Sequence, residues 1–548
     1  MPTDTRLRPG EPTLSRSDPL RPPVRLRSLL VAALPLLALV VTLVGFWWIE
    51  VSIPALVDGL DDTGRLLARM LPPVVAEPAD LLSLLLETLL IAVAGTGLAT
   101  LCSVPLAFVA AGTFEGARPL QAVVRAVIVL TRAIPTLVFA ILFVRAFGLG
   151  PLAGALAVAV HSIGMIAKLM ADAIEEVDPV PTEAVRACGA SRMQVAVSSV
   201  LPRVMPAFVS TVLYRLDINV RASAILGIVG AGGIGVALQT ALGSLNYRRA
   251  AGIIAVIIGL ILLLELLSVL IRRRVSVHAG ASSGVVLSEG RDPHTPGWGR
   301  GRLSRSAGVI GVIGLFAWSL SSLDADLQRL LDAWPRVQLI LSGMWPPVFS
   351  AEIVTGVLES LLMAVSATVV GVVLGLVLAM LTAHNVTPLG PLSAVVRSVV
   401  VVLRGIPDLV YALLFVAALG LGPFPGFLAL SISCTALAAK FFTDALEQLD
   451  PVPLEALRAV GATRWQVLVS GLFPQFVPSL TSNSLFVCDL ALRESIVLGI
   501  VGAGGIGFLL QESIATLRYD VTSAILIVIA VVVFSIESLA RWARSHVL

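Results

Sequence analysis

The sequence predicts an all-α protein that crosses a membrane many times and consists of two copies of one six-helix unit. Hydrophobic residues make up 57% of the 548 residues and charged residues only 13%, a composition typical of polytopic membrane proteins. From Glu87 and Glu359 onward the two halves align without a gap, 272 positions apart. An even number of spans per unit relates such repeats by a pseudo-two-fold axis along the membrane normal.

The first unit is expected to cover residues 29–272. Residues 1–28 are rich in Arg and Pro and lack apolar periodicity, which favours a disordered cytoplasmic tail. The run at 29–49 is long enough to span, since a crossing needs roughly 20 apolar residues. An amphipathic periplasmic segment is expected at 50–80. Further spans are predicted at about 83–112, 133–148, 152–174, 204–228 and 248–271.

The second unit, residues 307–548, repeats this plan, which brings the total to about twelve spans. A linker rich in Gly, Ser and Pro separates the units at 273–306 and is expected in the cytoplasm. The C-terminal segment 541–548 is basic and is also expected in the cytoplasm. The predicted spans lie near 307–320, 356–382, 405–420, 425–447, 476–500 and 520–541.

Several classes of function are excluded by what the sequence lacks. The only lysines are Lys168 and Lys440, and neither follows a glycine, so no GxxxxGK[ST] phosphate-binding loop is present. Any ATP-driven work therefore needs a separate subunit. The four cysteines show no metal-type spacing, and nucleophile-elbow and HExxH patterns are missing. We expect no catalytic residue, no metal site and no bound cofactor in this chain.

A polar, Arg-bearing segment interrupts the apolar runs once in each unit. It reads EAVRACGASRMQVAVSSVLP at 183–202 and EALRAVGATRWQVLVSGLFP at 455–474. Because such a segment is costly inside a bilayer, it is expected in water beside the membrane, where a partner can dock. A glycine breaks it into two short helices. An ordinary helical hairpin is the alternative. The candidate docking residues are Glu183, Ala184, Gly189, Glu455, Ala456 and Gly461.

A second shared string reads LGIVGAGGIGVALQ at 226–239 and LGIVGAGGIGFLLQ at 498–511. Its glycines make a poor membrane helix but a good bend. Irregular backbone at membrane depth survives only where it is buried in protein or lines a cavity. The string is therefore a candidate pore loop or gate whose free N–H groups could meet an anion, and a glycine-rich helix contact is the alternative. The candidate residues are Gly230, Gly232, Gly233, Gly235, Gly502, Gly504, Gly505 and Gly507.

Charged residues inside the predicted spans form a third candidate site. Asp217 and Arg221 are spaced i,i+4, as are Asp489 and Arg493, so each pair can neutralise itself on one helix face. A charge at the bilayer centre costs about 2.5–3.5 kcal/mol on the insertion scale. A role along the translocation pathway and an internal ion pair both stay open. The second unit carries an additional charge, Glu494.

Other charged residues have simpler explanations. Lys168 and Asp172, like Lys440 and Asp444, lie near the cytoplasmic end of the fourth span, where snorkelling explains them. Arg132 in RAIP and its counterpart in RGIP are expected to be positive-inside anchors at the cytoplasmic start of the third span.

Together, the RxIP motif, the Lys-x-x-x-Asp pairs, the EAxRAxGA segment and the LGIVGAGGIG string resemble the phosphonate ABC transporter permease family, over nearly all of both units. The resemblance implies two tandem six-helix ABC-importer permease units in the inner (plasma) membrane. It also implies import of phosphonates or of oxyanions such as phosphite, delivered by a periplasmic phosphonate-binding protein. In that family the permease usually has one unit and pairs with itself, whereas here one chain supplies both.

The resemblance further implies two copies of a cytoplasmic ATPase subunit, which bind the ATP that this chain does not. Movement would pass from them through the segments at Glu183 and Glu455 to the pore, and no nucleic acid is involved. Two alternatives stay open: an importer for another small solute, such as an amino acid or an osmoprotectant, and a gradient-driven secondary transporter with parallel repeats. The duplicated docking segment argues against the second.

Overall fold

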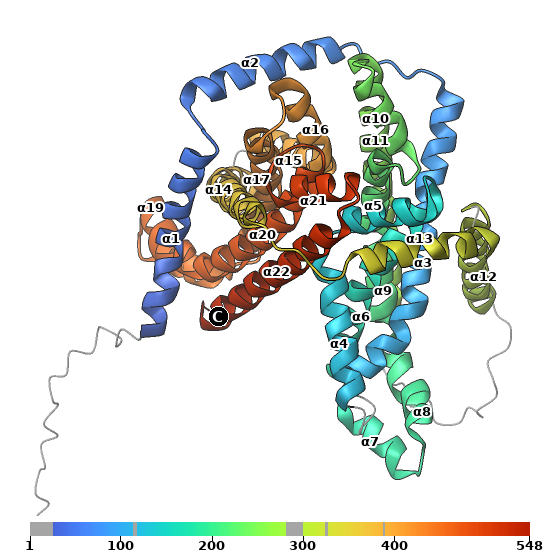
Figure 1. The fold of residues 1–548 in the computed structure, drawn as a ribbon. Coiled ribbons are helices and arrows are strands. Elements are labelled where there is room, and N and C mark those ends of the chain that lie inside the picture. The colour runs from blue at the N-terminus through green and yellow to red at the C-terminus, as the bar shows by residue number, and fades with distance from the viewer. Residues whose placement is uncertain (1–25, 113–117, 281–299, 324–326, 387–389, 548) are drawn as a thin grey trace, which may run out of the picture.

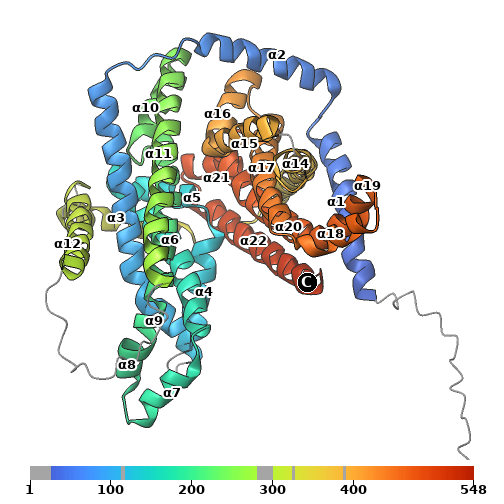
Figure 2. The same cartoon turned by 180° about the vertical axis from the view of Figure 1, so that it is seen from behind.

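The computed structural model describes residues 26–112, 118–280, 300–323, 327–386 and 390–547, and every regular element in these ranges is a helix. The helices form two bundles that meet near α5 and α22 and diverge from there (Figure 1). Figure 2 shows the same arrangement from behind.

The first bundle contains the long helices of the first unit. They are α3 (Pro78–Ala110), α4 (Arg118–Ala133), α5 (Thr136–Phe147), α6 (Pro151–Glu175), α9 (Leu201–Leu226) and α11 (Tyr247–Gly280). The shorter elements between them are α7 (Pro179–Ala187), α8 (Arg192–Val195), η1 (Ala196–Val200), η2 (Gly227–Val229) and α10 (Ile234–Gly243).

The second bundle repeats this order. Its long helices are α14 (Ala351–Thr382), α15 (Gly390–Gly405), α16 (Asp408–Leu419), α17 (Pro423–Glu447), α20 (Phe473–Ile500) and α22 (Tyr519–Val547). Its shorter elements are α18 (Pro451–Ala459), α19 (Arg464–Gln466), η3 (Val467–Leu472) and α21 (Gly505–Ala515). The all-α fold with two matching units is therefore confirmed.

Among the described residues, seven helices are long and apolar enough to cross a membrane, and nine if two bent pairs each count as one span. The other three of the expected twelve are α20 and the first helix of each unit, α1 (Leu26–Trp48) and α12 (Arg300–Ser321). Within α1 and α12 the apolar stretches are short, Pro35–Trp48 and Ser306–Ser321. Helix α20 carries the charges of Asp489, Arg493 and Glu494, which reduce its apolar character.

The predicted third span of each unit is wrong in shape. A helix already begins at Arg118, and α4 and α5 meet at an angle of 93°; α15 and α16 meet at 83°. The bend falls at Pro135, because proline lacks an N–H donor and disfavours helical geometry in the residue before it. Helix α5 restarts there, with the Val138 N–H donating to the Pro135 carbonyl at 3.1 Å.

The first helix of each unit packs on the other unit. Helix α1 lies along α14, and the ring of Phe46 in α1 also lies 5.6 Å from that of Phe427 in α17. Helix α12 lies along α3, where Phe316 covers Gly97 so closely that a Cβ at this glycine would overlap the ring. The units at 29–272 and 307–548 are therefore repeats in sequence, but each exchanges its first helix in the packed structure.

The amphipathic segments after these helices continue the exchange. Helix α2 (Ile53–Met70) packs on α16 of the second unit and on α11, while α13 (Leu327–Gly343) packs on α5 of the first unit and on α22. Leu66 and Met70 of α2 join Ile253 and Ile257 of α11 in one hydrophobic cluster. Each segment buries only part of its apolar face: Leu66 and Met70 of α2 and Ile340 of α13 are buried, whereas Leu60 and Leu339 are exposed.

The two units also share a core. Leu137, Val138 and Ile141 of α5 belong to the same cluster of buried side chains as Ile496 of α20 and Ile529 of α22. Leu226 and Ala231 belong to the same cluster, so this contact holds α5 and the start of the glycine-rich segment 226–239 against the second unit.

Candidate functional site

Each repeated polar segment folds as two short helices joined by a tight turn, which we call an elbow. In the first elbow (residues 178–200) the Asp178 carboxylate caps α7 by accepting the Val180 N–H at 3.0 Å. Gly189 then takes a φ of +82°, a conformation that favours glycine. Ser191 and Gln194 start α8 with a capping box, in which the Ser191 N–H donates to Gln194 Oε1 at 2.7 Å. The predicted helix, break and helix are all present.

The second elbow (residues 450–472) has the same construction. Asp450 caps α18, Gly461 again has a φ of +82°, and Thr463 with Gln466 forms the capping box of α19. Figures 1 and 2 show α7 and α8 at the far end of the first bundle and α18 and α19 at the far end of the second.

The elbows present both charged and apolar side chains at their surface. Glu183, Ala184, Glu455 and Ala456 are exposed, and Trp465 is 75% exposed. The other large apolar side chains exposed on the elbows are Val180, Met193, Val197, Val452, Val460 and Val469. Exposed apolar side chains gathered on one surface are typical of a protein interaction site.

The glycine strings bend the chain, as predicted. Gly230, Gly232 and Gly233 have φ values of +83°, +84° and +77°. Gly235 instead lies in the first turn of α10, where a Cβ would come within 2.6 Å of the Ala224 carbonyl. In the second string, positive φ values occur at Gly502, Gly504 and Gly505, and Gly507 lies in the first turns of α21.

A carboxylate from α3 binds the first string. The Gly233 N–H donates to Glu87 Oε1 at 3.2 Å, and the next N–H, of Ile234, donates to the Thr88 hydroxyl at 2.9 Å. These are N–H groups at the start of α10, where a helix attracts negative charge. These two N–H groups are therefore not free to meet a transported anion, because the protein supplies its own carboxylate and hydroxyl.

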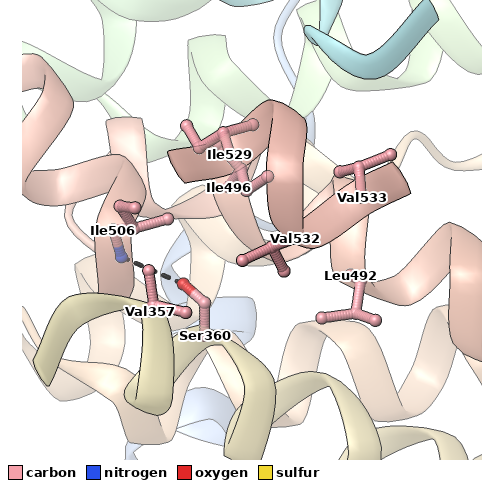
Figure 3. A pocket seen from close by; sticks show the side chains of 8 residues that line it. All are labelled: Val357, Ser360, Leu492, Ile496, Ile506, Ile529, Val532 and Val533. Atoms are coloured by element: carbon pink, nitrogen blue, oxygen red, sulfur yellow. Dashed lines mark hydrogen bonds between the residues drawn. The ribbon is translucent and has the colours of Figure 1, made fainter. Parts of the chain in front are cut away.

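The second string is held in the same way by α14. The Gly505 N–H donates to Glu359 Oε1 at 3.0 Å. The Ile506 N–H donates to the Ser360 hydroxyl at 3.0 Å, the bond that Figure 3 shows. Sequence reasoning used Glu87 and Glu359 only to mark where the repeat begins. A carboxylate at the same place in two apolar helices was the signal of their role.

A cavity of about 850 Å³ lies between the two units. Both strings contribute to its wall, through Gly230 and Gly502 and the residues before them. Because matching residues from both units line it, the cavity lies on the pseudo-two-fold axis. Its polar side chains are those of Arg145, Gln239 and Gln511.

A second cavity, of about 480 Å³, adjoins the first on the side of the second unit. The two share Leu421, Gly502 and Phe508 as lining residues. This side cavity is lined by three carboxylates, those of Glu352, Glu359 and Glu512.

The i,i+4 charge pairs form as their spacing predicts. Arg221 lies 3.2 Å from Asp217, and Arg493 lies 3.0 Å from Asp489. Neither pair is among the described residues that line the central cavity. Asp217 instead borders an apolar groove of about 270 Å³ between α3, α9 and α12. The pairs Lys168–Asp172 and Lys440–Asp444 also form, each at 2.5 Å.

Arg132 is not a simple interfacial anchor. Its guanidinium lies 3.1 Å from Glu537 in α22 of the other unit, and the two side chains are only 17% and 24% exposed. Arg493 approaches the same carboxylate at 3.9 Å. The bend after α4 turns Arg132 inward against α22, so the residue links the two bundles. Sequence spacing gave no indication of this pair.

Comparison with known proteins agrees with this arrangement. The family model "Binding-protein-dependent transport system inner membrane component" matches residues 103–277 and again 371–547. The chain is similar to the phosphate-import permease protein PhnE of Mycolicibacterium smegmatis, with 44% identity over 510 residues, 92% of this chain and 93% of that protein.

Shorter relatives match part of the chain. The phosphite transport system permease protein PtxC of Stutzerimonas stutzeri is 38% identical over 252 residues, 46% of this chain and 90% of its own length. The putative cryptic phosphonate transport system permease protein PhnE2 of Escherichia coli (strain K12) is 39% identical over 118 residues, 22% of this chain and 97% of its own length. The chain belongs to the family of binding-protein-dependent transport system inner membrane components and carries two of its permease units in tandem.

Proposed function

We propose that this chain forms the whole transmembrane part of an ABC importer for phosphonates or related phosphorus oxyanions such as phosphite. The observation that carries the proposal is that one chain supplies both walls of the central cavity and both elbows. The relatives are permeases named for the transport of phosphate, phosphite and phosphonate, which supports this class of cargo.

In this proposal two copies of a separate ATPase bind the elbows on the cytoplasmic side of the inner membrane. The exposed apolar side chains around Glu183 and Glu455 support such a contact. A periplasmic binding protein delivers the anion from the opposite side, and both chain termini lie in the cytoplasm. ATP binding draws the two ATPase copies together, the elbows move with them, and the bundles change their opening around the central cavity.

The test is reconstitution of the chain in liposomes with the ATPase subunits and the binding protein of its own host. We expect ATP-dependent uptake of phosphite, methylphosphonate or phosphate, each measured separately, and no uptake of methionine. Uptake that needs only an ion gradient and no ATPase would favour a secondary transporter and would overturn the proposal. ATP-dependent uptake of methionine alone would assign the importer to a different cargo.

A further inference from the structure

We propose that Arg145 and Gln511 form a subsite for a phosphorus oxyanion on one side of the central cavity. This inference rests on the proposed function and adds to it the residues that meet the anion within the permease. Arg145 comes from α5 of the first unit and Gln511 from α21 of the second, so the subsite spans the two units.

The charge, exposure and surroundings of Arg145 suit its guanidinium to bind an anion. It is the only charged residue among the described residues that line the cavity. It is exposed and, within the described part of the chain, makes no ion pair. Helix α5 begins at Thr136 and runs toward the periplasmic side of the proposed topology, so the positive-inside tendency does not explain a cation at its far end.

Gln511 offers a second, independent reason. Its Oε1 atom is buried and has no hydrogen-bond partner among the described residues. Leaving a buried polar atom unpaired costs about 1–3 kcal/mol, which favours rotation of the carboxamide toward a ligand in the cavity. A carboxamide carries both a donor and an acceptor, so it can bind a deprotonated and a protonated oxygen of the same phosphonate or phosphite. Gln239, its counterpart in the first unit, lines the same cavity.

The charges around the cavity place the anion off the axis. The residue that corresponds to Arg145 in the second unit is Ala417. On that side lies the cavity lined by Glu352, Glu359 and Glu512. An anion is therefore attracted toward Arg145 and repelled from the side cavity.

The subsite is suited to transient binding of the anion during transport rather than to tight binding. The Gly233 and Gly505 N–H groups, at the starts of α10 and α21, already donate to Glu87 and Glu359. They are therefore not available to donate hydrogen bonds to the anion. One guanidinium with one or two carboxamides gives the moderate binding that conduction requires, favourable enough for entry and weak enough for release.

The first experiment uses the complete complex, with its ATPase and binding protein, in liposomes, and phosphite and methylphosphonate as probes. Arg145→Gln is expected to lower the uptake rate about tenfold, the order expected when a charged hydrogen-bond partner is lost. ATP hydrolysis stimulated by the binding protein should stay within about twofold of wild type, because the elbows are intact. Arg145→Lys should retain part of the uptake, and Arg118→Gln, an exposed arginine at the start of α4, should behave as wild type.

The second experiment separates charge from shape. In a chain with Cys102 and Cys188 replaced by serine, Arg145→Cys is expected to lose uptake. Reaction with a methanethiosulfonate that carries an ethylammonium group should restore it, and reaction with the ethylsulfonate reagent should not. Rescue by both reagents, or by neither, would assign Arg145 a structural role and overturn the subsite.

The two proposals fail in different ways. If the wild-type complex transports none of the phosphorus oxyanions, the proposed function is wrong. If the wild-type complex transports them and Arg145→Gln does so at the same rate, the function stands and the subsite is wrong. Gln511→Leu should lower uptake less than Arg145→Gln, because a neutral hydrogen bond contributes less than a charged one.

Discussion

The carboxylates of Glu87 and Glu359 show what a glycine string needs in order to bend inside a membrane. Three glycines with positive φ in each string interrupt the helical hydrogen bonds, and in a bilayer each freed backbone N–H group must find a partner within the protein. The carboxylates, with the hydroxyls of Thr88 and Ser360, provide these partners. The glycines at positive φ leave the room that this close contact requires.

Alanine at Gly232 and Gly504 tests this role. Both glycines have positive φ, and a Cβ at Gly232 would lie 2.6 Å from Glu87 Oε1 and 3.1 Å from the Pro151 backbone. Left-handed geometry alone costs an alanine about 1–2 kcal/mol at each site. We expect Gly232→Ala with Gly504→Ala to lower both the melting temperature in detergent and the uptake rate.

The matched control is Gly243→Ala. Gly243 ends α10, no atom lies within 4 Å of its Cβ position, and its φ is not positive. This variant should keep the melting temperature and the uptake of wild type. If Gly232→Ala with Gly504→Ala shows the same melting temperature and uptake as Gly243→Ala, the close contact at these glycines is not required for stability or transport.

At the scale of elements, the elbows were predicted correctly because their signals are local. The capping residues, the glycine at the break and the apolar runs on either side all lie within one short stretch of sequence. The same holds for the i,i+4 ion pairs. Arg132 and Glu537, in contrast, are 405 positions apart, and their contact depends on the bend at Pro135 and on how the bundles meet. No local pattern carries that information.

The elbows lead to a prediction about coupling. Glu183 and Glu455 are exposed, so Glu183→Ala with Glu455→Ala should leave the melting temperature unchanged. Stimulation of the ATPase by the loaded binding protein should fall by roughly fivefold or more, since coupling between sites is typically worth 1–3 kcal/mol. Glu176→Ala, an exposed carboxylate outside the elbow, serves as the control. Stimulation at the wild-type level in the double variant would show that these glutamates do not couple.

At the scale of the molecule, the repeat predicted two matching units but not the exchange of their first helices. An apolar helix shows the same sequence pattern whichever bundle it packs on, so sequence alone could not assign α1 to α14 or α12 to α3. The structure assigns them through specific contacts, such as Gly45 of α1 against Ser366 of α14 and Phe316 of α12 against Gly97 of α3. The family model, which starts at residue 103 in the first unit and at 371 in the second, leaves these helices out.

Disulfide cross-linking tests the exchange. A Cβ at Gly45 of α1 would lie 3.5 Å from the Cβ of Ser366 in α14, within the range that a disulfide requires. In a chain without its four native cysteines, and with a protease site inserted between residues 280 and 300, Gly45→Cys with Ser366→Cys should keep the two fragments joined after cleavage. Gly45→Cys with Val373→Cys, on the exposed side of α14, should let them separate. Separation of the fragments in both cases would contradict the exchange.

The exchange of the first helices suggests a route by which a two-unit chain could arise. Two identical single-unit proteins that exchanged their first helices would form the same contacts as the two units do here. Joining their genes would then need only a connecting segment and no new packing. Once joined, the partners were no longer obliged to be identical, as a symmetric homodimer must be. Arg145 corresponds to Ala417, and the buried Arg215 of one unit corresponds to Val487 in the other, so the two units have diverged in residues that a symmetric pair would share.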